Sequence, residues 1–159
     1  MTDRADERRT LPIEQAVLLW CMRAWVQELK RPAGIGARIG DLLDRFGVPD
    51  AAPHLRGLMA ALGHGASRMI DVQCVCCTRI AADERALLEV LGLAQAGRSR
   101  EALRVLGGLV TANGARAALR SAEEVGRAMA AAGRVLPAPG HDGWGYAAGM
   151  SRPAGVTVH

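Results

Sequence analysis

Three of the four cysteines lie within four residues of one another, and their spacing allows more than one kind of chemistry. Cys74, Cys76 and Cys77 contain a Cys-x-Cys and a Cys-x-x-Cys spacing, and the second presents two thiolates to one tetrahedral zinc ion. This is half of a zinc site, so further ligands would have to come from distant residues such as His64. The sequence therefore predicts a metal site of Cys74, Cys76, Cys77 and His64, with zinc as the expected metal.

Two other interpretations of these cysteines stay open. The helix expected to begin near Ala82 would lower the pKa of a thiol that approached its N-terminus, and this would favour redox chemistry. Alternatively, Cys74 and Cys76 point into the core beside Ile70 and Val72 as small hydrophobic side chains. A thioredoxin-like site is set aside, because it needs a βαβ context that a chain of helices does not provide.

The cysteines belong to the one stretch of the sequence that is typical of a strand. Apolar and polar residues alternate over residues 69–76, which places Ile70, Val72, Cys74 and Cys76 on one face of an extended segment. A lone strand leaves its backbone groups unpaired. We therefore expect this segment to pair with residues 155–158 or with its copy in a homodimer.

Helices are expected on both sides of this segment. In the first one, apolar residues recur at three- and four-residue spacing, while Arg23 is grouped with the polar residues outside that face. Proline, glycine and capping residues place the expected helices at residues 12–30, 37–46, 53–62, 82–97, 99–111 and 113–133. The prediction is an all-α, compact bundle of five or six helices with one short extended segment near residues 69–76.

Length and composition indicate one domain. The chain has 159 residues, of which 50% are hydrophobic and 3% aromatic, so its core is expected to consist of Leu, Val, Ile, Met and Ala. Residues 11–136 are predicted to form a single helical domain. Residues 1–10 are predicted to be a polar, disordered N-terminal tail, and residues 137–159 a flexible tail rich in Gly and Pro.

The cellular location follows from what the sequence lacks. The first nine residues are rich in charge and do not resemble an export signal, and no apolar run approaches the roughly 20 residues that span a bilayer. The expectation is a cytoplasmic protein without membrane contact. Because thiols are kept reduced in the cytoplasm, the cysteines are not expected to form a structural disulfide framework.

Residues 37–62 resemble a helix-turn-helix, with Gly47 at the turn. DNA binding would need Arg38, Arg45 and Arg56 on an exposed face. Pro53 counts against this interpretation, because it would interrupt a recognition helix that began earlier. The formal net charge of +4 comes without a basic run or a basic and aromatic stripe, so nucleic-acid binding is retained only as the alternative.

Residues 87–114 resemble a single tetratricopeptide-type helix pair. The positions that carry the resemblance are small and large apolar residues at the spacing of that repeat, namely Leu88, Leu91, Gly97, Ala102, Leu106 and Leu109. The resemblance covers under a fifth of the chain and has no second copy. It implies a groove that accepts a helix or a peptide from a partner protein.

No arrangement of residues in the sequence is typical of an enzyme. His54 and His64 have no neighbouring carboxylate or nucleophile to orient them, so catalysis is disfavoured. We expect a small, non-enzymatic helical regulatory or accessory protein that acts through protein contacts, with a metal or thiol site at residues 74–77. The alternative is a metal- or redox-responsive regulator that binds DNA through the helix pair of residues 37–62.

Overall fold

The structure is a computed structural model that describes residues 6–140. Over these residues the chain forms six α-helices and one short 3-10 helix, without a β-strand. The elements are η1 (Glu7–Thr10), α1 (Ile13–Lys30), α2 (Ala37–Arg45), α3 (Ala51–Gly65), α4 (Ala82–Gln95), α5 (Ser99–Gly107) and α6 (Ala112–Ala131). The prediction of an all-α bundle with five or six helices is confirmed.

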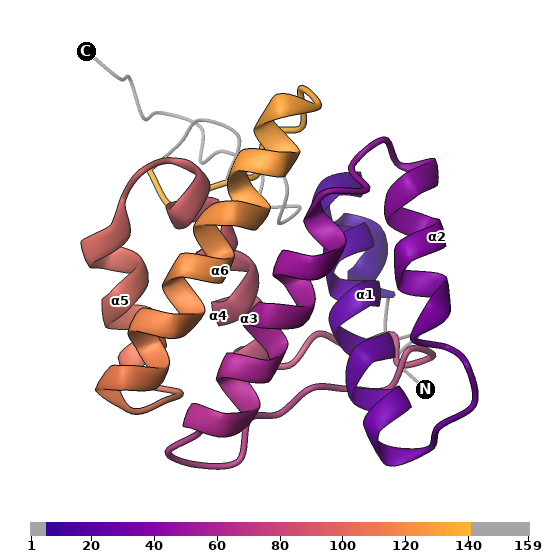
Figure 1. Cartoon of the computed structure of the whole chain (residues 1–159), viewed down its shortest axis with the longest axis horizontal. Coiled ribbons are helices and arrows are strands. Elements are labelled where there is room, and N and C mark those ends of the chain that lie inside the picture. Colours follow the sequence, from indigo (N-terminus) through magenta and orange to yellow (C-terminus); the bar gives the residue numbers. More distant parts are fainter. Residues whose placement is uncertain (1–5, 141–159) are drawn as a thin grey trace, which may run out of the picture.

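The helices pack in two groups that are in contact, α1 with α2, and α3 with α4, α5 and α6. Figure 1 shows α1 and α2 at one end of the molecule and α5 at the other, with α3 and α6 between them at the front and α4 behind. Helix α3 packs against α6, and α1 contacts α2, α3 and α4. The two groups therefore share one core.

The core has the predicted composition. Its fully buried large side chains come mainly from leucine, with Met22 and Ile39 among them, and many alanines fill the closer contacts. Small side chains let helices approach one another, so a core with few aromatic residues still packs without large gaps. None of the helices in residues 6–140 is long and apolar enough to cross a bilayer.

Glycines set the closest approach between helices. A Cβ atom at Gly65 of α3 would lie 2.7 Å from the Cα of Gly114 in α6, a separation that carbon atoms do not tolerate without a shift of the backbone. On α4, a Cβ at Gly92 would lie 1.8 Å from the carbonyl oxygen of Pro137. The absence of side chains at these positions therefore fixes how α3 meets α6 and how the chain after α6 crosses α4.

Helices α4 and α5 form the antiparallel hairpin that the sequence predicted. The turn between them contains Gly97 at a φ of 74°, where glycine is favoured because it has no Cβ. The N–H of Arg98 donates to the carbonyl of Leu93 over 2.9 Å, and that of Gly97 to Ala94 over 3.2 Å. This pair of bonds is the Schellman arrangement that ends a helix.

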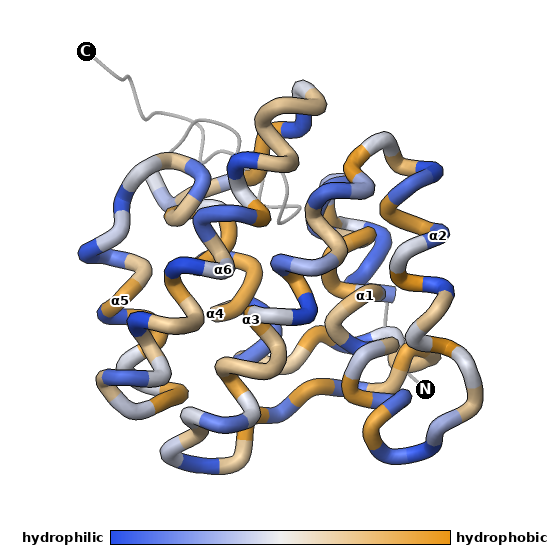
Figure 2. The backbone as a smooth tube through the Cα atoms, viewed as in Figure 1, coloured by the Kyte–Doolittle hydropathy of each residue, from blue (hydrophilic) through white to orange (hydrophobic). Residues whose placement is uncertain are grey.

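Residues 66–81, which we call the thiol segment, connect α3 to α4 without regular secondary structure apart from one isolated bridge between Ala66 and Val110. Figure 1 shows that the thiol segment runs behind α3 towards α1 and then returns to α4. Hydrophobic and hydrophilic residues alternate along it in Figure 2. The extended segment expected near residues 69–76 is present, but it is not a strand.

Side chains take the place of a neighbouring strand along the thiol segment. The Asp83 carboxylate accepts the N–H of Asp71 over 2.8 Å, and the Glu84 carboxylate accepts the N–H of Gln73 over 3.0 Å. These bonds satisfy backbone N–H groups that we expected to pair with a second copy of the segment or with residues 155–158. Residues 155–158 lie outside the described part of the chain.

The ends of the described chain pack on the domain. In the predicted N-terminal tail, Glu7–Thr10 form a 3-10 helix instead, capped by the Asp6 side chain. After α6, Leu136 and Ala138 are buried, and the Gln95 side chain donates to the carbonyl of Arg134 and accepts the N–H of Leu136. The packed chain thus reaches Ala138, and the rest of the predicted C-terminal tail, residues 141–159, lies outside the described residues.

Candidate functional site

Two of the cysteines are exposed and in contact. The sulfur atoms of Cys74 and Cys76 lie 2.8 Å apart, which is closer than unbonded sulfur atoms ordinarily approach, and both side chains face solvent. Cys77 is partly buried, and its sulfur contacts the Gln73 side-chain oxygen at 3.6 Å. Cys21 is buried in α1. The structure thus brings together two of the three clustered thiols.

A tight turn produces this arrangement. The N–H of Cys77 donates to the carbonyl of Cys74 over 3.1 Å, which closes residues 74–77 into what we call the thiol turn. Val75 packs against the core, while Cys74 and Cys76 on either side of it face solvent. The interpretation of Cys74 and Cys76 as buried hydrophobic side chains is therefore wrong, because Val75 takes the inward position.

A buried ion pair lies beneath the thiol turn. Arg23 of α1 and Glu84 of α4 are 1% and 0% exposed. Their side chains meet in a two-pronged contact, with Nε donating to Oε1 over 2.7 Å and Nη2 to Oε2 over 2.8 Å. This geometry is the strongest form of an arginine–carboxylate contact. We call these two residues the anchor pair.

The remaining hydrogen bonds of the anchor pair all go to the thiol segment. Arg23 donates to the carbonyls of Cys77 and Arg79, each over 2.6 Å. Glu84 accepts the N–H of Gln73 over 3.0 Å and that of Ala81 over 2.8 Å. A buried charge is tolerated only when its hydrogen-bonding capacity is used. Folding of the bundle therefore fixes the backbone on both sides of the thiol turn.

The N-terminal 3-10 helix contacts the same region from outside. Arg8 donates to the carbonyl of Val75 over 3.1 Å, and Glu7 accepts the N–H of Ile80 over 3.0 Å. Between η1 and α1 lies a pocket of about 260 Å³, whose lining includes Trp20 and Val75. The thiol turn is thus held from below by the anchor pair and from the side by η1.

The local electrostatics distinguish the two contacting thiols. The hydrogen bond from Cys76 lowers the pKa of Cys74, and nearby backbone N–H groups and the charge of Arg23 lower it further. The same hydrogen bond raises the pKa of Cys76. Burial raises the pKa of Cys21 to about 12. Of the two contacting thiols, Cys74 is therefore the one more readily converted to thiolate, and thiolate is the reactive form.

The four residues of the predicted metal site do not form one cluster. His64 is exposed near the C-terminal end of α3, and its Nδ1 lies 2.8 Å from the carbonyl oxygen of Ala60. Within residues 6–140, no group of three or more His, Cys, Asp or Glu side chains is placed to hold a metal ion. Structural zinc requires four ligands, whereas the described structure offers two sulfur atoms in contact.

The predicted helix-turn-helix region does form two helices, α2 and α3, joined by a turn in which Gly47 has a φ of 83°. Arg38, Arg45 and Arg56 are exposed, as DNA binding would require. Helix α3 begins at Ala51, so Pro53 lies in its first turn and does not interrupt it. On α2, however, the exposed carboxylates of Asp41 and Asp44 lie between the two arginines in sequence, which weakens the attraction for phosphate.

The anchor pair is what the sequence analysis missed. Arg23 was grouped with the polar residues of its helix, although its side chain is fully buried. A signal was available, because Arg23 is the one charged residue in an otherwise apolar run over residues 16–26. Its partner Glu84 lies 61 positions away, and no local pattern identifies it.

Comparison with protein-family models, with characterised proteins and with solved structures finds no match to this chain. The tetratricopeptide-type resemblance of residues 87–114 therefore extends only to the helical hairpin of α4 and α5.

Proposed function

We propose that this protein is a non-enzymatic helical regulatory protein in which Cys74 and Cys76 form a reversible redox pair. The observation that carries the proposal is the 2.8 Å contact between two solvent-exposed sulfur atoms in a turn that a buried ion pair holds in place. A thiol pair that responds to oxidants needs both accessibility and a nearby second sulfur. Cys74 and Cys76 have both.

The oxidant we propose is a hydroperoxide, and the chemistry takes two steps. The Cys74 thiolate attacks one peroxide oxygen, which breaks the O–O bond, converts Cys74 to a sulfenic acid and releases water or an alcohol. The Cys76 sulfur then attacks the sulfur of Cys74, loses its proton and expels water as the disulfide forms. Two electrons pass from the two sulfurs to one peroxide, and two low-molecular-weight thiols reverse the change by exchange.

The two thiols differ in the way that these steps require. The nucleophile should be the thiol with the lower pKa, and the hydrogen bond from Cys76 lowers the pKa of Cys74. The resolving sulfur must be within reach, and that of Cys76 is already in contact. Cys77 is directed towards Gln73 instead, so it is not the expected partner.

Disulfide formation would alter the contacts of η1. A bond between Cys74 and Cys76 closes a ring through Val75, whose carbonyl accepts the hydrogen bond from Arg8. We infer that the ring turns this carbonyl away from Arg8 and loosens η1 over the pocket that Trp20 lines. Oxidation of Cys74 and Cys76 would then change the surface around α1.

Contact with another protein is the second element of the proposal. Met69, in the same thiol segment, is 91% exposed, and it borders an apolar pocket of about 200 Å³ whose lining includes Trp25 and Leu62. Exposed methionine beside an apolar depression is common at protein contact sites. The thiol segment thus combines the proposed redox pair with a surface suited to a partner.

The test is to oxidise the reduced, full-length protein with one equivalent of hydrogen peroxide, block free thiols and map the disulfide by mass spectrometry. We expect one bond, between Cys74 and Cys76, that dithiothreitol reverses. Cys74→Ser and Cys76→Ser should each abolish it, whereas the matched control Cys77→Ser should retain it. Amide exchange at Arg9 and Leu11, whose N–H groups bond within η1, should accelerate on oxidation.

Two results would contradict the proposal. If Cys74 and Cys76 both remain free after exposure to peroxide, the contact between their sulfur atoms has no redox role. If the reduced protein instead binds one zinc ion per chain and loses it in Cys77→Ser, the thiols are metal ligands and the sequence-based interpretation of a metal site is correct.

A further inference from the structure

A second surface, at the other end of the bundle, carries arginines that form no ion pair within the described residues. Helix α5 exposes Arg100 and Arg104, and α6 exposes Arg116 and Arg120. Each pair is spaced by four residues, so its two side chains leave the helix on the same side, about 6 Å apart along the axis. We call these four residues the arginine face.

The charges of the arginine face are only partly balanced by nearby carboxylates. Among the described residues, neither Arg100, Arg104 nor Arg120 takes part in an ion pair, and Arg116 donates only to the neutral side chain of Asn113, over 2.8 Å. The nearby carboxylates make their ion pairs with other arginines. Glu101 pairs with Arg98, which lowers the pKa of this carboxyl, and the charge of Arg104 lowers it further. Glu124 pairs with Arg127.

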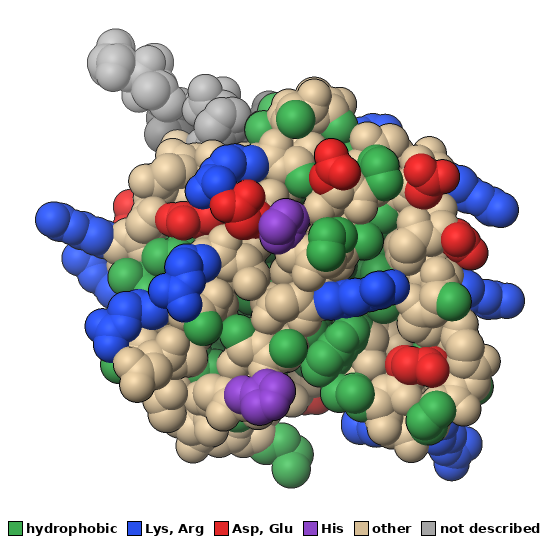
Figure 3. All heavy atoms as spheres, in the orientation of Figure 1, with side chains coloured by type: hydrophobic (Ala, Val, Ile, Leu, Met, Phe, Trp, Pro, Cys, Tyr) green, Lys and Arg blue, Asp and Glu red, His purple; other side chains and the backbone are tan. Residues whose placement is uncertain are grey.

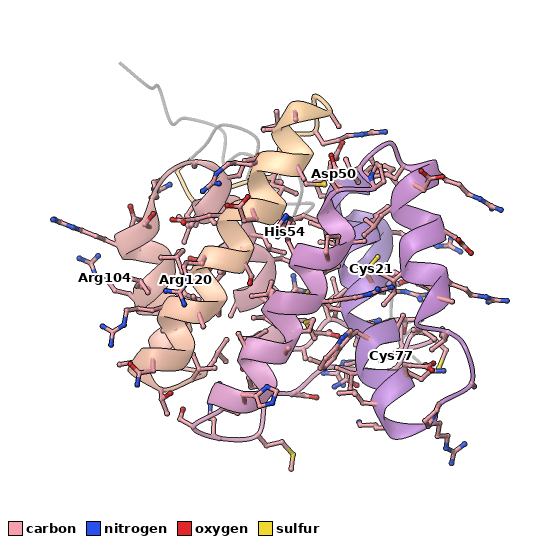
Figure 4. The ribbon with its side chains drawn as sticks, viewed as in Figure 1. Cys21, Asp50, His54, Cys77, Arg104 and Arg120 are labelled. Carbon is pink, nitrogen blue, oxygen red and sulfur yellow. The ribbon has the colours of Figure 1, made fainter. Side chains whose placement is uncertain are left out.

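The neighbouring helices bring these side chains together. Helices α5 and α6 are in contact, and Figure 4 shows Arg104 and Arg120 next to each other over them. In the space-filling view of Figure 3, basic side chains gather over α5 and α6. Residues 98–131 contain six arginines and three glutamates, so this end of the molecule carries net positive charge.

The arginine face lacks the features of a stable protein interface. The large hydrophobic side chains that the described structure exposes are Ile13, Leu29, Met69 and Val135, and none of these lies on α5 or α6. Protein interfaces have an apolar centre enriched in aromatic residues and methionine. Contacts with a phosphate backbone need no such centre, because they are electrostatic and are made by arginine and lysine.

Single-stranded nucleic acid is also a poor match. Recognition of single strands relies on bases that stack on aromatic side chains, and α5 and α6 contain no aromatic residue. A duplex presents two lines of phosphates on its outside. Two adjacent rows of guanidinium groups on neighbouring helices can contact such lines without entering a groove.

We propose that the arginine face binds the phosphate backbone of double-stranded nucleic acid without sequence selectivity. This site is separate from the predicted DNA-binding region of α2 and α3. On α2, two aspartates balance the two arginines, whereas residues 98–131 carry six arginines against three glutamates. The inference does not depend on the redox role of the thiol turn.

The experiment measures binding of the reduced, full-length protein to a fluorescent mixed-sequence DNA duplex of about 20 base pairs by anisotropy. With three or four phosphate contacts, log K should fall with log salt concentration at a slope of about −3 to −4. The variant Arg104→Gln/Arg120→Gln should bind about tenfold more weakly at low salt, and its slope should be smaller by about 2.

The matched control is Arg38→Gln/Arg45→Gln, which removes the same charge from α2 and should bind like the parent protein. The proposal is overturned if the parent does not bind the duplex at low salt, or if the α2 variant loses binding while the α5 and α6 variant keeps it. It is also overturned if polyglutamate of equal charge binds as tightly as the duplex, since the face would then fit an acidic protein.

Discussion

Different contacts hold two regions of the molecule in place, namely the crossing of α3 and α6 and the thiol segment. Where the helices cross, Gly65 and Gly114 have no side chains, and the two backbones touch. In the thiol segment the backbone is held at a distance from the helices by the long side chains of Arg23 and Glu84. At the crossing, backbone packing is joined by a hydrogen bond from the N–H of Thr111 to the carbonyl of Gly65 over 2.8 Å. The thiol segment depends on hydrogen bonds to a buried ion pair.

The difference shows how a helical bundle can position a reactive loop. Packed helices are stable by burial of apolar surface and do not specify the path of an irregular connection. Four backbone bonds to the anchor pair do specify it. We therefore expect changes in the anchor pair to affect both stability and thiol chemistry, and changes at the helix crossing to affect stability first.

Removal of half of the anchor pair should have the largest effect. In Glu84→Gln the guanidinium of Arg23 stays buried without a counter-charge, and such a loss typically costs about 3–5 kcal/mol. The measurement is the free energy of unfolding in urea. A cost below about 1 kcal/mol would show that the ion pair does not anchor this region.

The control for this change removes both charges together. Arg23→Met/Glu84→Met should cost less than the sum of the single changes, because no unpaired charge remains. The N–H groups of Gln73 and Ala81 would still lose their acceptor. Their amide exchange should therefore accelerate even if the bundle stays folded.

A methyl group at the helix crossing should have a smaller effect. Gly65→Ala would place Cβ 2.7 Å from the Cα of Gly114, and relief of this overlap should cost about 1–3 kcal/mol. Gly63→Ala, two residues earlier in α3, meets no atom within 4 Å and should add about 0.5–1 kcal/mol through helix propensity. Thermal unfolding of the two variants should shift in opposite directions.

The smallest effect concerns reactivity within the thiol turn. Because the pKa of Cys74 is lowered by its hydrogen bond with Cys76 and that of Cys76 is raised by the same bond, alkylation of Cys74 should reach half its maximal rate at a lower pH than alkylation of Cys76. Replacement of Cys76 by Ala removes the hydrogen bond and should raise the pKa of Cys74. Peptide-resolved alkylation rates at several pH values would show the opposite order if the assignment is wrong.

Local patterns in the sequence were sufficient for much of the fold. Gly47 and Gly97 end the preceding helices at positive φ, as their positions between apolar periodic stretches indicated. The composition of the core also followed from the sequence. These features depend on residues close together in the chain, which is why periodicity and capping rules recover them.

The candidate site depends on contacts that local patterns do not contain. The alternation over residues 69–76 predicted inward-facing cysteines, but the turn closed by Cys74 and Cys77 reverses the chain and turns Val75 inward. That turn is stabilised by Arg23 and Glu84, which come from two different helices. Likewise, Glu7–Thr10 fold against the domain because Ile80 and Val75 offer partners, and a polar stretch does not reveal them.

The most direct test of the redox pair is the equilibrium between its dithiol and disulfide forms in glutathione buffers, measured for the folded protein and again in denaturing urea. If the fold positions Cys74 and Cys76 as partners, the equilibrium constant for their disulfide should be about tenfold or more larger in the folded protein, which corresponds to about 1.4 kcal/mol. An equal or smaller constant in the folded state would mean that the contact reflects sequence proximity alone, and it would contradict the proposed redox role.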